Sequence, residues 1–189
     1  MFNQLLNIAS STHWQDSHFP EHCHEQVLSW LLDETSLTSK LEDKCDKFTV
    51  KVKQQATTNS NETALSNFFP YPEKVFVREV LLHCDGIANV FAQTEIPYST
   101  LSDNQEKLAD IGSTSLGKIL FQDKTLQRAN IEITEFLPGS QMHQFSQSLQ
   151  QTCSHSLWAR RSLFYIKNKP LLVSELFLPA SGIYQCPAT

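Results

Sequence analysis

The sequence predicts an α+β fold, in which one antiparallel sheet of about six strands is covered on one face by short helices. Three observations support this prediction. About six apolar or alternating segments have the length of strands. Most of these segments are separated by short turns typical of hairpins. The helical patterns gather early and in the middle of the chain instead of alternating with the strands.

The helical segments are short. Residues 1–21 are polar and weakly patterned, and we expect a loose N-terminal arm there. Residues 25–32 place their apolar side chains on one side of a helix, and a second helical turn is expected at 36–41. A capping-box spacing at its start predicts a helix over 102–111. Another helix is predicted over 114–121.

Strands are predicted at residues 48–52, 74–84, 88–96, 130–136, 160–167 and 171–178. Asp85-Gly86 lies between two of them and is a strong hairpin signal, because both residues tolerate positive φ. Pro97 ends the strand that returns from this turn. The polar residues 53–67 suggest a mobile loop or a poorly paired edge, and residues 137–156, rich in Gln and Ser, suggest a surface insertion.

The size and composition bound the function. A chain of 189 residues without repeats or linkers is expected to form a single domain over 1–189. A net charge of −5 argues against binding to nucleic acid or to anionic membranes. Five cysteines without a Cys-x-x-Cys motif suggest reduced thiols and a cytoplasmic location. We expect no signal peptide, because the first residues lack a basic region followed by a long apolar stretch, and no apolar run has the ~18 residues that would insert in a bilayer. No leftover apolar seam is apparent, so a monomer is expected.

Several common catalytic and binding motifs are missing. His18, His22, Cys23 and His24 are close in sequence, but they have no matching ligand pair elsewhere, and we expect no metal site. No Gly-x-Ser-x-Gly, Walker or Gly-x-Gly-x-x-Gly motif occurs, which argues against nucleotide cofactors bound by the usual loops.

Two charged residues stand in apolar strand faces. Arg78 shares a face with Phe76, Val80 and Leu82, and Glu175 shares one with its own apolar neighbours. A buried charge costs several kcal/mol unless it is paired or meets a ligand. Two explanations remain open: the charges form buried pairs within the sheet, or they line a cavity for a polar ligand.

Further charges flank these two. Arg160 and Arg161 form a second basic spot and point to opposite faces of their strand. Glu79 and Glu132 are expected to face solvent.

These residues carry a resemblance to the chorismate pyruvate-lyase family of ubiquinone biosynthesis. The similar segments run in the family's order from about residue 26 to 184, and the final one is the most specific. They are Trp30-Leu31-Leu32, Ser36-Leu37-Thr38, residues 77–82, 96–101, Leu116-Gly117, Leu120-Phe121, 131–133, 157–162 and 170–181.

The resemblance implies a six-stranded antiparallel sheet with helical lids over an enclosed site, and a cofactor-free lyase that converts chorismate into 4-hydroxybenzoate and pyruvate. It assigns Arg78 to the ring carboxylate and Glu175 to the ring hydroxyl. It also implies substrate contacts at Leu37, which replaces a frequent methionine, and at Leu116, through its backbone amide. From position alone, Arg160 or Arg161 could assist the leaving group.

Two other readings stay open. Effector-binding domains of one class of bacterial transcription regulators share this architecture and only bind small ligands, so the protein could be a binding module for a small aromatic acid. The second alternative is a homologue of the enzymes that binds hydroxybenzoate without turnover. Leu37 and the stretch 137–156, in which the chain departs from the family, keep this alternative open.

Overall fold

The computed structural model describes residues 6, 8, 13–15, 23–68, 72–102 and 116–184. Within these ranges, six strands form one antiparallel sheet in the order β1-β2-β3-β6-β5-β4. The strands are β1 (Phe48–Asn59), β2 (Lys74–Cys84), β3 (Ile87–Pro97), β4 (Gln127–Phe136), β5 (Leu157–Ile166) and β6 (Lys169–Phe177). The predicted α+β class and the six-stranded sheet are therefore confirmed.

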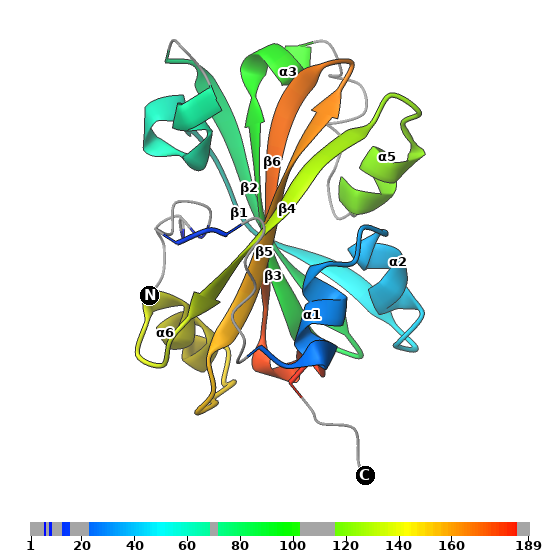
Figure 1. The fold of residues 1–189 in the computed structure, drawn as a ribbon, viewed down its shortest axis with the longest axis vertical. Coiled ribbons are helices and arrows are strands. Elements are labelled where there is room, and N and C mark those ends of the chain that lie inside the picture. The colour runs from blue at the N-terminus through cyan, green and yellow to red at the C-terminus, as the bar shows by residue number, and fades with distance from the viewer. Residues whose placement is uncertain are drawn as a thin grey trace.

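The two faces of the sheet carry different helices (Figure 1). The α-helices are α1 (Glu25–Leu31), α2 (Leu37–Glu42), α3 (Tyr98–Ser102), α5 (Leu116–Gln122) and α6 (Gln141–Ser148). The 3-10 helices are η2 (Ser60–Glu62), η3 (Ala64–Phe68) and η4 (Pro179–Ser181). Helices α1, α2 and α5 lie on the side that we call the front face, to which Arg78 and Glu175 point; α6, η2 and η3 lie on the opposite, back face. The prediction that helices cover only one face is therefore wrong.

Two tight turns fix the register of the strands. Asp85 and Gly86 have φ values of 51° and 82°, so the β2–β3 hairpin has two residues with positive φ, as the Asp-Gly pair predicts. Lys167 and Asn168, with φ values of 50° and 63°, do the same between β5 and β6. These hairpins make Ala92 the partner of Val80, and Glu175 the partner of Arg160.

The front face carries two separate apolar clusters. One packs α1 and α2 against the sheet through Trp30, Leu41 and Phe177. The other packs α5 against it through Leu120 and Phe164. On the back face, α6 packs against β3 through an edge-to-face contact of Phe145 and Phe91 at 5.0 Å. Because these two clusters of the front face are separate, there is room between them for a cavity over the middle of the sheet.

Two segments are more ordered than the sequence suggests. Of the two alternatives for 53–67, the mobile loop is wrong: β1 continues to Asn59 as an edge strand, although it pairs with β2 along its whole length. Its polar composition reflects its place at the edge of the sheet, where much of its surface is exposed. Residues 137–156 are not only surface loop, because they contain α6, whose Met142 and Phe145 are buried.

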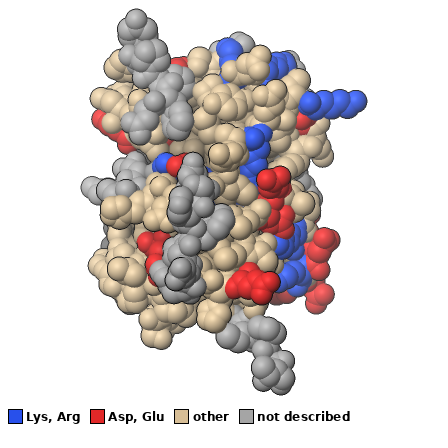
Figure 2. Space-filling view, in the orientation of Figure 1, with Lys and Arg blue, Asp and Glu red and all other residues tan. Residues whose placement is uncertain are grey.

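The N-terminal arm is packed where it is described. Leu6 and Ile8 are buried on the back face, and Gln15 forms an isolated bridge with Ile133. Most of the predicted 102–111 helix lies outside the described residues, although a shorter helix, α3, precedes it. On the surface seen in Figure 2, basic and acidic side chains are interspersed along the side of α1, α2 and α5. None of the described helices has the length and apolar character needed to span a bilayer.

Candidate functional site

A cavity lies between the two apolar clusters of the front face. Its empty space is about 590 Å³, part of which is open to solvent. Its apolar walls come from Val80, Ala92, Leu120, Phe164 and other residues of both clusters. Three arginines and one glutamate are its charged lining residues in the described chain: Arg78, Arg128, Arg160 and Glu175.

Arg78 reaches the cavity from β2. Its side chain is 1% exposed, and burial lowers the pKa of its guanidinium. A guanidinium held in such surroundings favours an anion beside it, and its planar fork matches a carboxylate.

Glu175 lines the same cavity from β6 and pairs with Arg160 on the neighbouring strand. Arg160 Nε donates to Glu175 Oε2 at 2.6 Å, and the two residues are direct cross-strand partners. The glutamate side chain is 16% exposed. Among the described residues, no donor to its other carboxylate oxygen, Oε1, is found. This oxygen can accept a hydrogen bond from a ligand.

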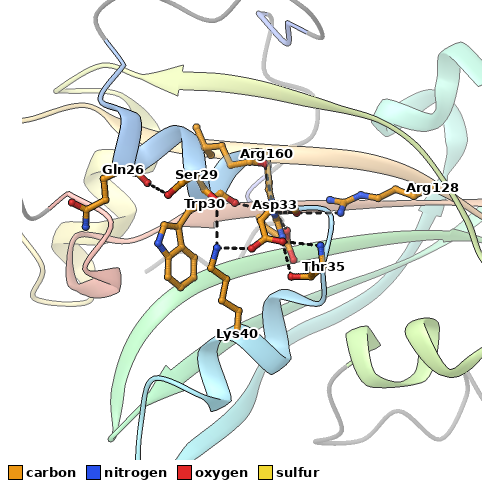
Figure 3. A network of polar contacts seen from close by, with 10 residues as sticks. Gln26, Ser29, Trp30, Asp33, Thr35, Lys40, Arg128 and Arg160 are labelled. Carbon is orange, nitrogen blue, oxygen red and sulfur yellow. Dashed lines mark hydrogen bonds and ion pairs between the residues drawn. The ribbon is translucent and has the colours of Figure 1, made fainter.

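Arg160 also holds the connection between α1 and α2. Its Nη1 donates to the carbonyls of Trp30 at 2.9 Å and Asp33 at 2.7 Å (Figure 3). These carbonyls lie at and just beyond the end of α1, where helical carbonyls lack partners within the helix. One buried arginine thus joins a cavity-lining carboxylate to the segment that leads into α2.

Asp33 stabilises this connection through its own side chain. Its carboxylate accepts hydrogen bonds from Lys40 Nζ at 2.5 Å and from the backbone N–H of Thr35 at 2.8 Å. Burial acts to raise the pKa of Asp33, but these hydrogen bonds outweigh it and lower the pKa to about 2. The loop before α2 is therefore held from both sides: by arginines on the sheet and by Lys40 of the helix (Figure 3).

Arg128 is a cavity-lining residue that sequence reasoning missed. The predicted strand began at residue 130, but β4 begins at Gln127. The register between β4 and β5 shifts between Arg128 and Ile131, so a bulge changes which face the residues before it occupy. Simple alternation from Ile131 would have placed Arg128 on the back face.

The other predicted residues separate into two groups. Leu37 and Leu116 line the cavity as the first residues of α2 and α5, two helices that contact each other. Arg161 points to the back face instead, where it pairs with Glu132 at 2.7 Å and stacks over Trp14. The structure therefore does not bring Arg161 to the cavity.

The expectation that Glu79 faces solvent is wrong. Its side chain is fully buried on the back face and accepts hydrogen bonds from Lys53 Nζ, the Leu6 N–H and Gln93. Glu132 is 31% exposed and is held in its pair with Arg161. Of the residues considered for metal binding, His18 and His22 lie outside the described residues. The described part of the chain contains no group of three or more His, Cys, Asp or Glu side chains placed to hold a metal ion.

Solved structures share the fold at low sequence identity. The effector domain of PhnF from Mycobacterium smegmatis aligns with a TM-score of 0.57 and 13% identity, over 78% of this chain and 90% of that domain. The gene product SA0254 from Staphylococcus aureus aligns with a TM-score of 0.58 and 13% identity, over 83% of this chain and 96% of that one. At this identity the likeness concerns the fold alone.

Sequence relatives cover nearly the whole chain. A probable chorismate pyruvate-lyase of Psychromonas ingrahamii is 54% identical over 95% of this chain and 97% of the relative. The chorismate pyruvate-lyase of Erwinia tasmaniensis is 35% identical over 97% of this chain and 95% of its own length. The family model described as chorismate lyase matches residues 8–187. The chain, with its charged cavity on an antiparallel sheet, belongs to the chorismate lyase family.

Proposed function

We propose that this protein converts chorismate into 4-hydroxybenzoate and pyruvate as a carbon–oxygen lyase, the first step of ubiquinone biosynthesis in this family. The observation that carries the proposal is the front-face cavity, where Arg78 and Glu175 line one hollow in a chain of this family. The alternative explanation, in which buried charges form pairs within the sheet, holds only in part. Arg160 and Glu175 do form such a pair, but both also line the cavity.

In the proposed complex, Arg78 binds the ring carboxylate through its planar fork. Glu175 accepts a hydrogen bond from the ring hydroxyl, for which its Oε1 atom is suited. Leu37 and Leu116 contribute contacts at the starts of α2 and α5, where the first N–H groups of a helix have no acceptor within it. We propose that α2 and α5 act as lids over the ligand.

The proposed reaction is an elimination that makes the ring aromatic. The C4–H bond breaks and its electron pair enters the ring, while the C3–O bond breaks and its electrons leave with enolpyruvate. The proton lost from C4 is balanced by the proton that enolpyruvate gains at its methylene carbon to become pyruvate. Aromatisation drives the reaction, so no cofactor is required.

The protein then has two tasks. It fixes the conformation of the substrate, and it stabilises negative charge on the departing oxygen. Glu175 steers the proton, since it lies at the hydroxyl-bearing end of the ring. The apolar walls exclude water and strengthen each polar contact. The product keeps the carboxylate and the hydroxyl that these residues bind, so we expect 4-hydroxybenzoate to inhibit the enzyme.

The experiment is a direct assay. Purified protein is incubated with chorismate, 4-hydroxybenzoate is followed by its absorbance, and pyruvate is measured by coupling to lactate dehydrogenase. Equal amounts of both products above the spontaneous rate support the proposal. Binding of 4-hydroxybenzoate without turnover would instead establish the alternative function, a binding module, which the fold shared with the PhnF effector domain makes worth testing.

The proposal includes a cytoplasmic monomer. The described cysteines Cys23, Cys45, Cys84 and Cys153 are free thiols, which is consistent with a reducing compartment. Light scattering of the purified protein would reveal any dimer.

A further inference from the structure

Among the described residues that line the cavity, three are arginines and one is a glutamate, so its lining has a net positive charge. Of the arginines that line it, Arg160 forms an ion pair with Glu175. No ion pair to Arg128 is found among the described residues. Burial lowers the pKa of Arg128 and the neighbouring charge of Arg160 lowers it further, and together they outweigh the nearby carboxylates of Glu175, Glu34 and Asp33, which act to raise it. A guanidinium in this position would be stabilised by an anion in the cavity.

Neutral contacts hold Arg128 in place. Its Nε donates to Ser162 Oγ at 2.9 Å, and its Nη1 makes a longer contact of 3.4 Å with the carbonyl of Asp33. Its guanidinium lies 5.1 Å from the centre of the Phe164 ring. Among the described residues, no acceptor for its Nη2 group is found. The contacts therefore orient the guanidinium at the cavity wall and leave donor capacity for a ligand.

Chorismate and its product differ in the charge that they present. The product 4-hydroxybenzoate has one carboxylate, whereas chorismate has a second one on the enolpyruvyl group at C3, next to the C4 hydroxyl. If Glu175 binds that hydroxyl, the second carboxylate lies near the Glu175 end of the cavity. Arg128 and Arg160 both donate to the carbonyl of Asp33, and Arg160 pairs with Glu175, which places Arg128 at this end.

We propose, on the basis of the proposed function, that Arg128 binds the enolpyruvyl carboxylate of the substrate and so distinguishes chorismate from its product. Arg160 is less suited to this role, because its charge is already paired with Glu175 and its Nη1 group also holds the carbonyls of the α1–α2 connection. Arg160 is instead a positioning residue for Glu175.

The test compares affinity for substrate and for product in Arg128→Gln. We expect kcat/KM for chorismate to fall about 10- to 100-fold, the effect of losing a charge-assisted hydrogen bond, mostly through KM. The dissociation constant of 4-hydroxybenzoate, measured by calorimetry, stays close to that of the wild type. Arg128→Lys keeps the charge but loses the planar fork, so its kcat/KM for chorismate should lie between those of the wild type and Arg128→Gln. Arg161→Gln, one strand away on the back face, is the matched control and keeps both values.

The outcomes separate this inference from the proposed function. If the wild type does not turn over chorismate, the proposed function fails and the inference fails with it. If the wild type is active but Arg128→Gln weakens chorismate and 4-hydroxybenzoate equally, Arg128 only maintains the site, and the inference is overturned. Unchanged kcat/KM for chorismate in Arg128→Gln would overturn it as well.

Discussion

The front and back faces of the sheet both carry buried charge, but they use it differently. Arg78 and Glu79 are neighbours on β2, and both are almost fully buried. Glu79, on the back, is surrounded by the donors of Lys53, Gln93 and the Leu6 N–H. Arg78, on the front, borders a cavity. On β5, likewise, Arg160 lines the cavity on the front face, whereas Arg161 pairs with Glu132 on the back face. A charged residue in an apolar strand therefore does not by itself mark a site; the presence of a hollow beside it does.

The largest expected effect tests this contrast on β2. Arg78→Ala should reduce kcat/KM for chorismate at least about 100-fold, because a buried charged ligand contact is removed. The fold should survive, because Arg78 borders a cavity and the apolar clusters on either side of it keep their packing. Absorbance assays give the rate, and circular dichroism gives the fold. Normal turnover in this variant would exclude the role of Arg78 in binding the substrate.

The adjacent back-face residue should respond in the opposite way. Glu79→Ala leaves the Lys53 ammonium and the Leu6 N–H without their acceptor, and we expect a loss of about 2–4 kcal/mol in the free energy of unfolding. Urea denaturation measures it. At temperatures where the variant is folded, kcat should match the wild type. A selective loss of kcat in a fully folded variant would break the contrast between the faces.

Glu175→Gln should have a smaller effect on the front face. The amide oxygen can still accept from Arg160, so the shape of the site is kept, but the negative charge that holds the hydroxyl is lost. We expect kcat to fall about 10- to 100-fold with little change in the melting temperature. Unchanged turnover would limit Glu175 to packing and pairing.

The back face should also show its own pH dependence through Glu95. Burial raises the pKa of this carboxyl to about 7, despite hydrogen bonds from Ala64, Leu65 and Thr63. Between pH 4.5, the usual pKa of a glutamate, and about pH 7, the folded chain retains a proton on Glu95 that the unfolded chain has released. This group therefore makes stability fall as pH rises through that window, by about 3 kcal/mol at most.

Glu95→Gln is the variant that isolates this effect. Unfolding free energies measured from pH 4.5 to 8 should decline less steeply in the variant than in the wild type. If the free energy of unfolding depends on pH equally in both proteins, ionisation of Glu95 does not destabilise the fold and the prediction is wrong.

The smallest effect is expected for Arg161→Gln. Its pair with Glu132 is half-buried, with the glutamate 31% exposed, so we expect a loss of no more than about 1 kcal/mol in stability. Chorismate turnover should be unaltered, because the side chain lies on the face away from the cavity. A clear loss of turnover would mean that the two faces are coupled through β5.

The sequence predicts the centre of the sheet better than its edges. β2, β3 and β6 were located closely, because they are buried, apolar and bounded by Asp85-Gly86, Pro97 and Pro170. β1 was cut short at residue 52, because an edge strand with an exposed surface tolerates polar residues. The buried side of α6 was missed because its few apolar residues stand among Gln and Ser.

The site was predicted in part, for a related reason. Alternation on β2 and β6 was enough to mark Arg78 and Glu175, since neither strand has a bulge near them. The predicted exposure of Glu79 is wrong because its partners come from β1, β3 and the N-terminal arm, and periodicity does not reveal partners so distant in sequence.

The register shift in β4 has a consequence for comparing sequences. Because Arg128 faces the cavity only by virtue of the extra residue before Ile131, an insertion or deletion there would re-aim the arginine more effectively than most substitutions. An alignment that places a gap one position away would pair Arg128 with a residue from the other side of the sheet. In homologues, the residue equivalent to Arg128 is therefore best identified from the pairing of β4 with β5, and not from local sequence similarity.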